Sequence, residues 1–305
     1  MPKICYVKRR FSEASLLQIK QANEIIAEYG GQGFSLTLRQ LYYQFVARDI
    51  IPNNIKSYKN LGSVVNDGRL AGLIDWDHIQ DRTRHLEKNA HFRNPGEAIK
   101  SVSGWYGIDM WANQKYRPEV WIEKDALIGV IEDICTRLDV PYFSCRGYTS
   151  QSEMWVGGQR IGRWTKNAKK QTPVIFHFGD HDPSGKDMTR DIVDRLEMFM
   201  GGVKLERLAL NMDQIEKYEP PPNPAKTTDS RAEAYIAEFG NDSWELDALE
   251  PKVITALIEK SVMALVDKKV WKADQERLGA EKMLLEAVST NWERIADDLE
   301  RNGDA

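Results

Sequence analysis

Hydrophobic residues follow a regular alternation in the second part of the chain. Between residues 119 and 210, short apolar runs alternate with segments whose apolar residues recur at helical spacing. The predicted strands are 119–123, 140–145, 174–178 and 203–210, and the predicted helices are 126–138, 151–169 and 186–200. Strands that alternate with helices are typical of a doubly wound, mostly parallel sheet. The predicted fold class is therefore α/β.

The first part of the chain has a helical period instead. Ser12 is a candidate N-cap for a helix that stops at Gly30 and Gly31, and two further helices are predicted at 35–49 and 57–71. The polar stretch 73–84 then predicts a hairpin wing. Helices followed by a wing indicate a winged-helix DNA-binding module. A helical bundle that docks on the second domain is the alternative interpretation.

In the winged-helix interpretation, basic residues lie on or next to the recognition helix. The candidate DNA-binding residues there are Lys56, Lys59 and Arg69. Residues 94–117, which contain a proline and several glycines and tryptophans, predict a hinge. The predicted domains are therefore 1–110 and 111–305. Two charged amphipathic helices are predicted after Pro251, with their apolar stripe assigned to the core.

Composition narrows the class of protein. The 305 residues are 42% hydrophobic and 29% charged, with a net charge of −4, and we expect a folded, cytoplasmic protein without membrane contact because no apolar run approaches spanning length. Residues 1–110 carry 15 Lys and Arg against 11 Asp and Glu, whereas the remaining residues carry 27 against 35. This asymmetry is compatible with a DNA-contacting domain joined to an acidic one, and equally with solvated surface. The three widely spaced cysteines indicate free thiols.

Carboxylates follow two of the predicted strands. Asp180 and Asp182 come directly after the strand 174–178, and Glu123 ends the strand 119–123. Parallel strands end at one edge of a sheet, where open α/β folds place ligands. Oxygen ligands suit Mg²⁺ or Mn²⁺ better than zinc. The sequence therefore predicts a Mg²⁺ site at Glu123, Asp180 and Asp182.

The same loop has two other interpretations. An acidic turn could simply cap the helix that starts near Ser184, and the sequence leaves this open. A phosphate-binding P-loop is excluded, because five residues separate Gly179 from Gly185 and Asp187 stands where the P-loop has Ser or Thr. No nucleotide-binding site is predicted.

Adjacent tyrosines occur on the second predicted helix. A phenol has a pKa of about 10, so it needs a base, a cation or a metal to become a nucleophile near neutral pH. Arg39 lies four residues before Tyr43 on the same helix face and could favour the phenolate. Neighbouring residues on a helix diverge by about 100°, so we expect either Tyr42 or Tyr43 to face the core and the other to face outward. Ordinary aromatic core residues are the alternative.

Several motifs together resemble the topoisomerase VI A subunit family, which includes the meiotic double-strand-break proteins. The motif Arg39-Gln-Leu-Tyr-Tyr43 resembles the catalytic tyrosine motif of the family's winged helix. Three segments resemble its Rossmann-like Toprim domain. They are Ile122-Glu-Lys124, Cys145-Arg-Gly-Tyr148 and Gly179-Asp-His-Asp-Pro-Ser-Gly185. More weakly, Trp244-Glu-Leu-Asp-Ala-Leu249 resembles the family's late Glu-Leu-rich segment. Tyrosine, glutamate and Asp-x-Asp also occur in the family's order.

The resemblance implies a function and partners. It implies Mg²⁺-dependent cleavage of double-stranded DNA by Tyr43 with help from Arg39, in a homodimer where one protomer's tyrosine meets the other's metal site. Arg146, in the glycine turn at residues 145–148, is a further candidate DNA contact. Strand passage would need a separate ATPase subunit. Two alternatives stay open: a Toprim nuclease that uses water, and a non-catalytic DNA-binding protein.

Overall fold

The computed structural model describes residues 3–79, 89–166 and 170–303. The first three helices are α1 (Glu13–Gly31), α2 (Leu38–Ala47) and α3 (Ile55–Leu70). Ser12 caps α1, as predicted, by accepting a hydrogen bond from the Ser15 N–H at 3.2 Å. Thr37 and Gln40 form a capping box at the start of α2. The three helices pack around a shared core that includes Leu41, Phe45 and Leu61.

The predicted wing is only partly within the described residues. Residues 73–79 form turns, with an isolated bridge between Leu36 and Ile79, and no strand hairpin occurs in this stretch. Residues 80–84 of the predicted wing lie outside the described part. Within the described residues, the N-terminal part of the chain is therefore a group of three helices, α1 to α3, which we call the front module.

Four parallel strands form the sheet of the second part within the described residues. They are β1 (Tyr116–Ile122), β2 (Tyr142–Ser144), β3 (Thr172–Phe178) and β4 (Lys204–Ala209). Their order is β2-β1-β3-β4, and every neighbouring pair is parallel. The predicted α/β class is confirmed, and β1 and β3 are the two central strands.

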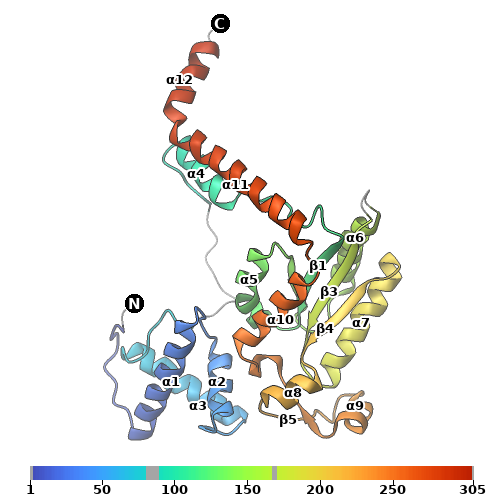
Figure 1. Ribbon diagram of the computed structural model, residues 1–305. Helices are drawn as coiled ribbons and strands as arrows, with labels where there is room; N and C mark the ends of the chain where they lie inside the picture. Colours follow the sequence, from blue (N-terminus) through green and yellow to red (C-terminus); the bar gives the residue numbers. More distant parts are fainter. Residues whose placement is uncertain (1–2, 80–88, 167–169, 304–305) are drawn as a thin grey trace.

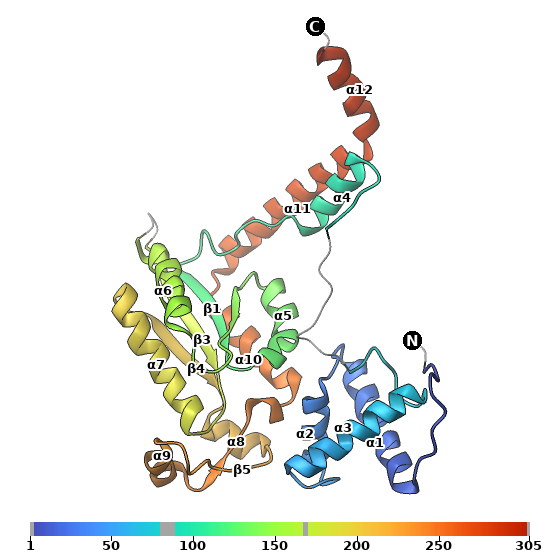
Figure 2. The ribbon, with the colours of Figure 1, turned by 180° about the vertical axis from the view of Figure 1, so that it is seen from behind.

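Helices cover both faces of this sheet (Figures 1 and 2). One face packs against α5 (Ile128–Arg137) and α10 (Pro251–Met263), and the other packs against α6 (Gln151–Lys166) and α7 (Pro183–Met200). The two faces alternate along β1: Val120 and Ile122 belong to the first core, and Trp121 belongs to the second. A short 3-10 turn, η1 (Asp125–Leu127), connects β1 to α5. After β4 come α8 (Met212–Tyr218), β5 (Asn223–Pro224), α9 (Ala232–Phe239), β6 (Asp242–Ser243) and a second 3-10 turn, η2 (Leu246–Ala248).

The remaining helices form an arm that projects from the sheet (Figures 1 and 2). The stretch 94–117, predicted as a hinge, contains α4 (Pro95–Trp105), which lies along α11 (Lys268–Thr290). Asn94 caps α4 by accepting a hydrogen bond from the Glu97 N–H at 2.8 Å. The last helix, α12 (Trp292–Gly303), extends the arm. Of the helices after Pro251, α10 joins the core as predicted, whereas the core assignment is wrong for most of α11, where only Trp271 and Asp274 are buried.

No helix among the described residues is long and apolar enough to cross a membrane.

Candidate functional site

Glu123 and Asp180 lie in contact at the carboxyl edge of the sheet. The Glu123 N–H donates to the Phe178 carbonyl at 2.8 Å, which continues the pairing of β1 with β3. The Asp180 N–H in turn donates to Glu123 Oε2 at 2.8 Å. The two strands bring these residues to one edge, as expected, because the Asp180 backbone is hydrogen-bonded to the Glu123 side chain.

This pair of carboxyl groups is poorly solvated. Burial, and next the Asp180 carboxylate, raise the pKa of Glu123 to about 7, although the Asp180 N–H and Lys124 act in the opposite direction. Burial also raises the pKa of Asp180 to about 6 despite the nearby Lys124. Bringing two acids together out of water disfavours their charged forms. An added cation would therefore be favourable at this edge.

Asp182 has a different role in the structure. Its side chain is the N-cap of α7, where Oδ1 accepts a hydrogen bond from the Gly185 N–H at 2.6 Å. The helix-capping interpretation thus holds for Asp182. Its charge still contributes weakly to the raised pKa of Glu123. Residues 3–79, 89–166 and 170–303 contain no group of three Asp, Glu, His or Cys side chains close enough to bind one metal ion.

Two of the three predicted ligands therefore fit a divalent cation. Mg²⁺ typically takes one or two carboxylates and completes its octahedral shell with water and substrate phosphate. Glu123 and Asp180 meet this requirement because they are in contact and the negative charge of Asp180 disfavours the ionisation of Glu123. Asp182 could contribute only after releasing the first turn of α7.

A cluster of ion pairs joins this edge to the front module. Lys124 Nζ lies 3.0 Å from Asp180 Oδ2 and 2.8 Å from Glu245 Oε2, and it also pairs with Asp247. Arg39 of α2 pairs with Glu245, and its Nε lies 2.9 Å from Asp247 Oδ2. Burial lowers the pKa of Lys124, but these carboxylates raise it above its ordinary value. The cluster holds α2 against the sheet edge.

Tyr43 lies beside this cluster. Arg39 donates a long hydrogen bond of 3.5 Å to the Tyr43 hydroxyl. Burial, and next Glu245, raise the pKa of Tyr43 above its ordinary value, while Arg39 lowers it less. The Tyr43 side chain is only 4% exposed, so in this conformation the phenol is held neutral.

The expectation that one tyrosine faces outward is wrong for the rings. Tyr42 is also 4% exposed, and its hydroxyl donates to Asn53 Oδ1 at 2.9 Å. Both rings border a cavity of about 210 Å³ between α2, α3 and the β5 segment, which Tyr58, Asn223 and Glu245 also line. The two rings also pack on each other edge to face, with their centroids 5.4 Å apart. Tertiary packing therefore covers both rings, although the two residues leave the helix in different directions.

The candidate DNA-binding residues divide into two groups. Lys56 and Lys59 are exposed on α3, and the Arg146 side chain is 74% exposed beside Asp125. Arg69, in contrast, faces inward. It donates to the carbonyls of Trp76 and Ile79 at 2.7 and 2.9 Å and stacks on the Trp76 ring. Arg69 thus satisfies backbone carbonyls in the turns after α3, and its guanidinium is not presented to a ligand.

Arg207 is a site residue that the sequence analysis missed. From β4, it donates to the carbonyls of Gly179 and Gly185 at 2.9 Å each, and also to the Asp180 carbonyl. It thereby fixes the turn that carries Asp180, and burial lowers its own pKa to about 10. The sequence signal for this role was an arginine within the predicted strand 203–210.

Glu245 and Asp247 were also missed as site residues, although their segment was noted for its resemblance. The Leu246 N–H between them donates to Asp180 Oδ1 at 2.8 Å. The His181 backbone pairs with Trp244 through two hydrogen bonds of 2.8 and 2.9 Å, which attaches this segment to the Asp180 turn. The late Glu-Leu segment is therefore part of the site.

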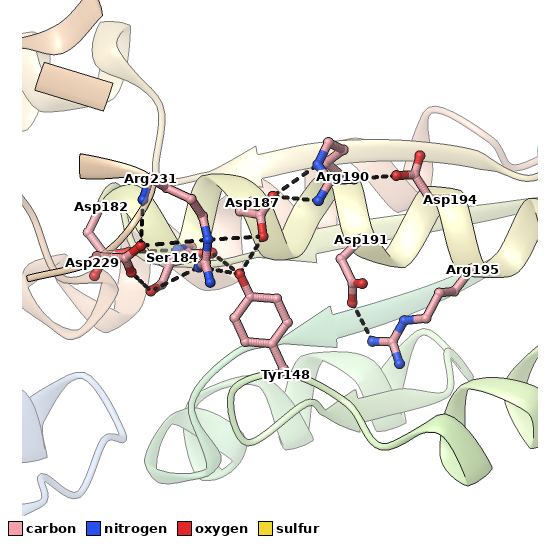
Figure 3. A network of polar contacts seen from close by, with 11 residues as sticks. Tyr148, Asp182, Ser184, Asp187, Arg190, Asp191, Asp194, Arg195, Asp229 and Arg231 are labelled. Atoms are coloured by element: carbon pink, nitrogen blue, oxygen red, sulfur yellow. Dashed lines mark hydrogen bonds and ion pairs between the residues drawn. The ribbon is translucent and has the colours of Figure 1, made fainter. Parts of the chain in front are cut away.

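A second polar network lies at the first turns of α7 (Figure 3). The Tyr148 hydroxyl donates to Asp187 Oδ2 and accepts from Arg231, each at 2.6 Å. Ser184 donates to Asp229 Oδ2 at 2.7 Å. These contacts connect the glycine turn and the α9 segment to α7, so they stabilise the helix that Asp182 caps.

Comparison with other proteins adds no assignment. No protein-family model matches the chain, and no curated protein matches it. The geometry at the sheet edge, together with the motifs that form it, is the basis for assigning a function.

Proposed function

We propose that this protein cleaves double-stranded DNA by tyrosine transesterification, as a compact relative of the topoisomerase VI A subunit with winged-helix and Toprim domains. One observation carries the proposal. The motif that bears the candidate nucleophile and the edge that bears the candidate metal ligands belong to one continuous polar network. It runs from Tyr43 through Arg39 and Glu245 to Lys124 and Asp180.

The chemistry requires a single displacement at phosphorus. The Tyr43 oxygen forms a bond to phosphorus and loses its proton, while the bond from phosphorus to one deoxyribose oxygen breaks and that oxygen takes up a proton. The phosphotyrosyl product keeps the bond energy needed for resealing. Mg²⁺ or Mn²⁺, held by Glu123 and Asp180, would neutralise phosphate oxygens.

Arg39 has two roles in this proposal. In the docked arrangement it is paired with Glu245 and Asp247, and Tyr43 stays protonated. A DNA phosphate at the neighbouring cavity would compete for the guanidinium, because arginine binds phosphate strongly. Loss of the Glu245 contact and opening of α2 would then expose the phenol. Arg39 would next favour the phenolate.

The DNA path follows exposed basic residues. Lys56 and Lys59 on α3 and Arg146 beside the acidic edge would contact backbone phosphates. A homodimer in which tyrosine and metal site come from different protomers, a separate ATPase subunit for strand passage, and a cytoplasmic location all belong to the same proposal. The homodimer and the ATPase subunit derive from the family resemblance, and the cytoplasmic location derives from a sequence in which no apolar run approaches membrane-spanning length.

A second function is favoured by the burial of Tyr43. A phenol that is 4% exposed and has a raised pKa is a poor nucleophile. Water could instead attack the phosphate at the Glu123–Asp180 edge, which would make the protein a metal-dependent nuclease. In that case Tyr43 would only position Arg39.

One experiment separates these functions. Labelled duplex DNA is incubated with the protein and Mg²⁺ or Mn²⁺, and the mixture is denatured before electrophoresis. We expect covalent protein–DNA adducts that are lost in Tyr43→Phe and Asp180→Asn. Tyr58→Phe, which alters another hydroxyl at the same cavity, should retain them.

Each other outcome overturns the leading proposal. Cleavage that survives Tyr43→Phe but is lost in Asp180→Asn would support the nuclease. Binding without scission in either metal would indicate a non-catalytic DNA-binding protein.

A further inference from the structure

The N-terminal segment, residues 5–10, runs past the C-terminal end of α3 (Figure 2). The Tyr6 N–H donates to the Leu70 carbonyl at 2.8 Å. Gly72 has a φ of +73°, and a Cβ there would lie 2.8 Å from the Cys5 nitrogen, so this close approach of the two stretches of chain requires glycine. These contacts fix an exposed stretch of backbone beside the helix.

Arg69 supports the same stretch from inside the molecule. Its guanidinium stacks on the Trp76 ring, 4.4 Å from the ring centroid. The Tyr6 ring packs edge-on against Trp76, with the two centroids 5.9 Å apart. Arg69, which the sequence predicted as a DNA contact, therefore helps to hold a segment that carries other basic residues.

Three consecutive basic residues follow these anchors. Lys8, Arg9 and Arg10 are all exposed. Arg9 Nη1 lies 3.1 Å from Asp67 Oδ1 of α3, which holds the basic stretch against the helix. Among the residues that the structure describes, Lys8 and Arg10 have no carboxylate partner. Their charges are therefore available to an anion.

One face of α3 connects this basic stretch to a second one. Lys56 and Lys59 lie at the other end of the helix, and all of their neighbours toward Asp67 on this face are polar. Asn60, Ser63 and Asp67 follow the i, i+3, i+7 spacing of a single helix face, and both Asn60 and Ser63 are exposed. The face is therefore positive at both ends and carries an uncharged amide and hydroxyl at its centre.

The dimensions of this face match a groove of duplex DNA. From Lys56 to Asp67 the helix rises by about 17 Å. The major groove of B-DNA is about 12 Å wide and is bordered by a row of phosphates on each side. Side chains at the centre of a helix can then reach base edges while basic residues at its ends meet the two phosphate rows. The deep, narrow major groove of double-stranded RNA does not admit a helix in this way.

We propose that the N-terminal segment and α3 together bind one major groove of duplex DNA. Basic residues at the two ends of the face contact the two phosphate rows, and the amide and hydroxyl at its centre contact base edges. The phosphate-contacting residues are Lys8, Arg10, Lys56 and Lys59, and the base-contacting residues are Asn60 and Ser63. The choice of DNA as the ligand rests on the proposed function, but this surface includes neither Tyr43 nor the acidic edge.

The first test measures the binding of a short labelled duplex of mixed sequence by fluorescence anisotropy, in EDTA and over a range of salt concentrations. Arg10→Gln should weaken binding and should reduce the slope of log K against log salt by about one, because one phosphate contact is lost. Lys100→Gln, which removes an exposed charge from α4, should change neither quantity. Unchanged binding in Arg10→Gln, or equal binding of double-stranded RNA, would overturn the proposal.

The second test determines base contacts by selection from a duplex library of random sequence. The wild type should enrich a short motif. Asn60→Ala should lose the preference at one position of that motif and bind the selected duplex about tenfold more weakly, with an unchanged salt slope. Circular dichroism verifies that the variants are folded. Absence of a motif for the wild type, or the same motif for Asn60→Ala, contradicts the base contacts and thus the proposal.

Both tests omit metal and so separate this inference from the proposed function. Both effects without any covalent adduct in Mg²⁺ or Mn²⁺ would leave the inference standing and contradict the proposed cleavage. Normal adducts together with unchanged DNA binding in Arg10→Gln and Asn60→Ala would contradict this inference alone.

Discussion

Lys124 Nζ lies 3.0 Å from Asp180 Oδ2, so the proposed metal ligand already has a cationic partner from its own chain. The same ammonium contacts Glu245 and Asp247, which come from a distant segment. Lys124 therefore links the acidic edge to the front module, and a metal ion would compete with it for Asp180.

Replacement of Lys124 should be strongly destabilising. Lys124→Met leaves Asp180 and the 1% exposed Asp247 side chain without this cation, and breaking a buried pair in this way costs about 3–5 kcal/mol of unfolding free energy. Denaturant titration measures the loss. Lys252→Met, which removes an exposed lysine paired with Glu250, should cost far less because solvent screens that pair. Mg²⁺ should restore part of the loss only if Asp180 binds it.

Glu123 should make the metal-free protein less stable as pH rises. Its pKa is raised from 4.5 to about 7, so folding favours the protonated form. The cost is absent below the unfolded pKa, grows as pH rises through the interval between the two values and is complete above about 7. Glu123→Gln should therefore be more stable than wild type near pH 8, by on the order of 2 kcal/mol, and equal to it near pH 4.5. A difference that does not vary with pH, measured in EDTA, would contradict this.

His181 should have the opposite effect on stability. Burial, followed by Lys186 and Arg207, lowers its pKa from 6.5 to about 4, so the folded protein keeps the ring neutral. The contribution of His181 to stability is then complete above the unfolded pKa of 6.5 and is lost as pH falls toward 4. His181→Gln should lose less unfolding free energy than wild type between about pH 7.5 and 5. The exposed His91, changed to Gln, serves as the control.

Gly185 should not tolerate a side chain. A Cβ there would lie 2.2 Å from the Asp180 carbonyl oxygen, which Arg207 also holds. Gly185→Ala should lower the unfolding free energy by more than about 2 kcal/mol, through strain in the turn that carries Asp180. At Gly162 of α6, a Cβ would meet only Met200 at 3.4 Å. Gly162→Ala should be neutral or stabilising by up to about 1 kcal/mol, because alanine favours helix. Equal melting temperatures for the two variants would contradict the argument.

Much of the fold could be predicted because local pattern and tertiary structure agree. Each predicted strand from 119 to 210 is present. A short apolar run between two segments of helical periodicity is most readily buried as a strand of a parallel sheet. The arm could not be predicted in this way. The pairing of α4 with α11 joins residues such as Ser103 and Lys282, which are 179 positions apart, and the proline and glycines near α4 resemble those of a hinge.

The candidate site, like the fold, could be predicted only in part from the sequence. Glu123 and Asp180 follow from strand ends in a parallel sheet, but the ion pairs around them do not. Lys124 and Glu245 are 121 residues apart, and Glu245 lies on a short segment without a strand or helix period. Asp182 shows a further limit, because an acid after a strand has the same sequence pattern whether it binds a cation or caps a helix.

The central position of β1 and β3 affects how this chain could change without losing its acidic pair. Glu123 and Asp180 extend two hydrogen-bonded neighbours, so the rigid pleat between them sets their separation. Insertions after α5 or α6 would lengthen the route from one acid to the other while leaving that separation unaltered. The covalent distance between the two groups can therefore drift in evolution or be altered by engineering, whereas a slip in strand register would displace one acid relative to the other.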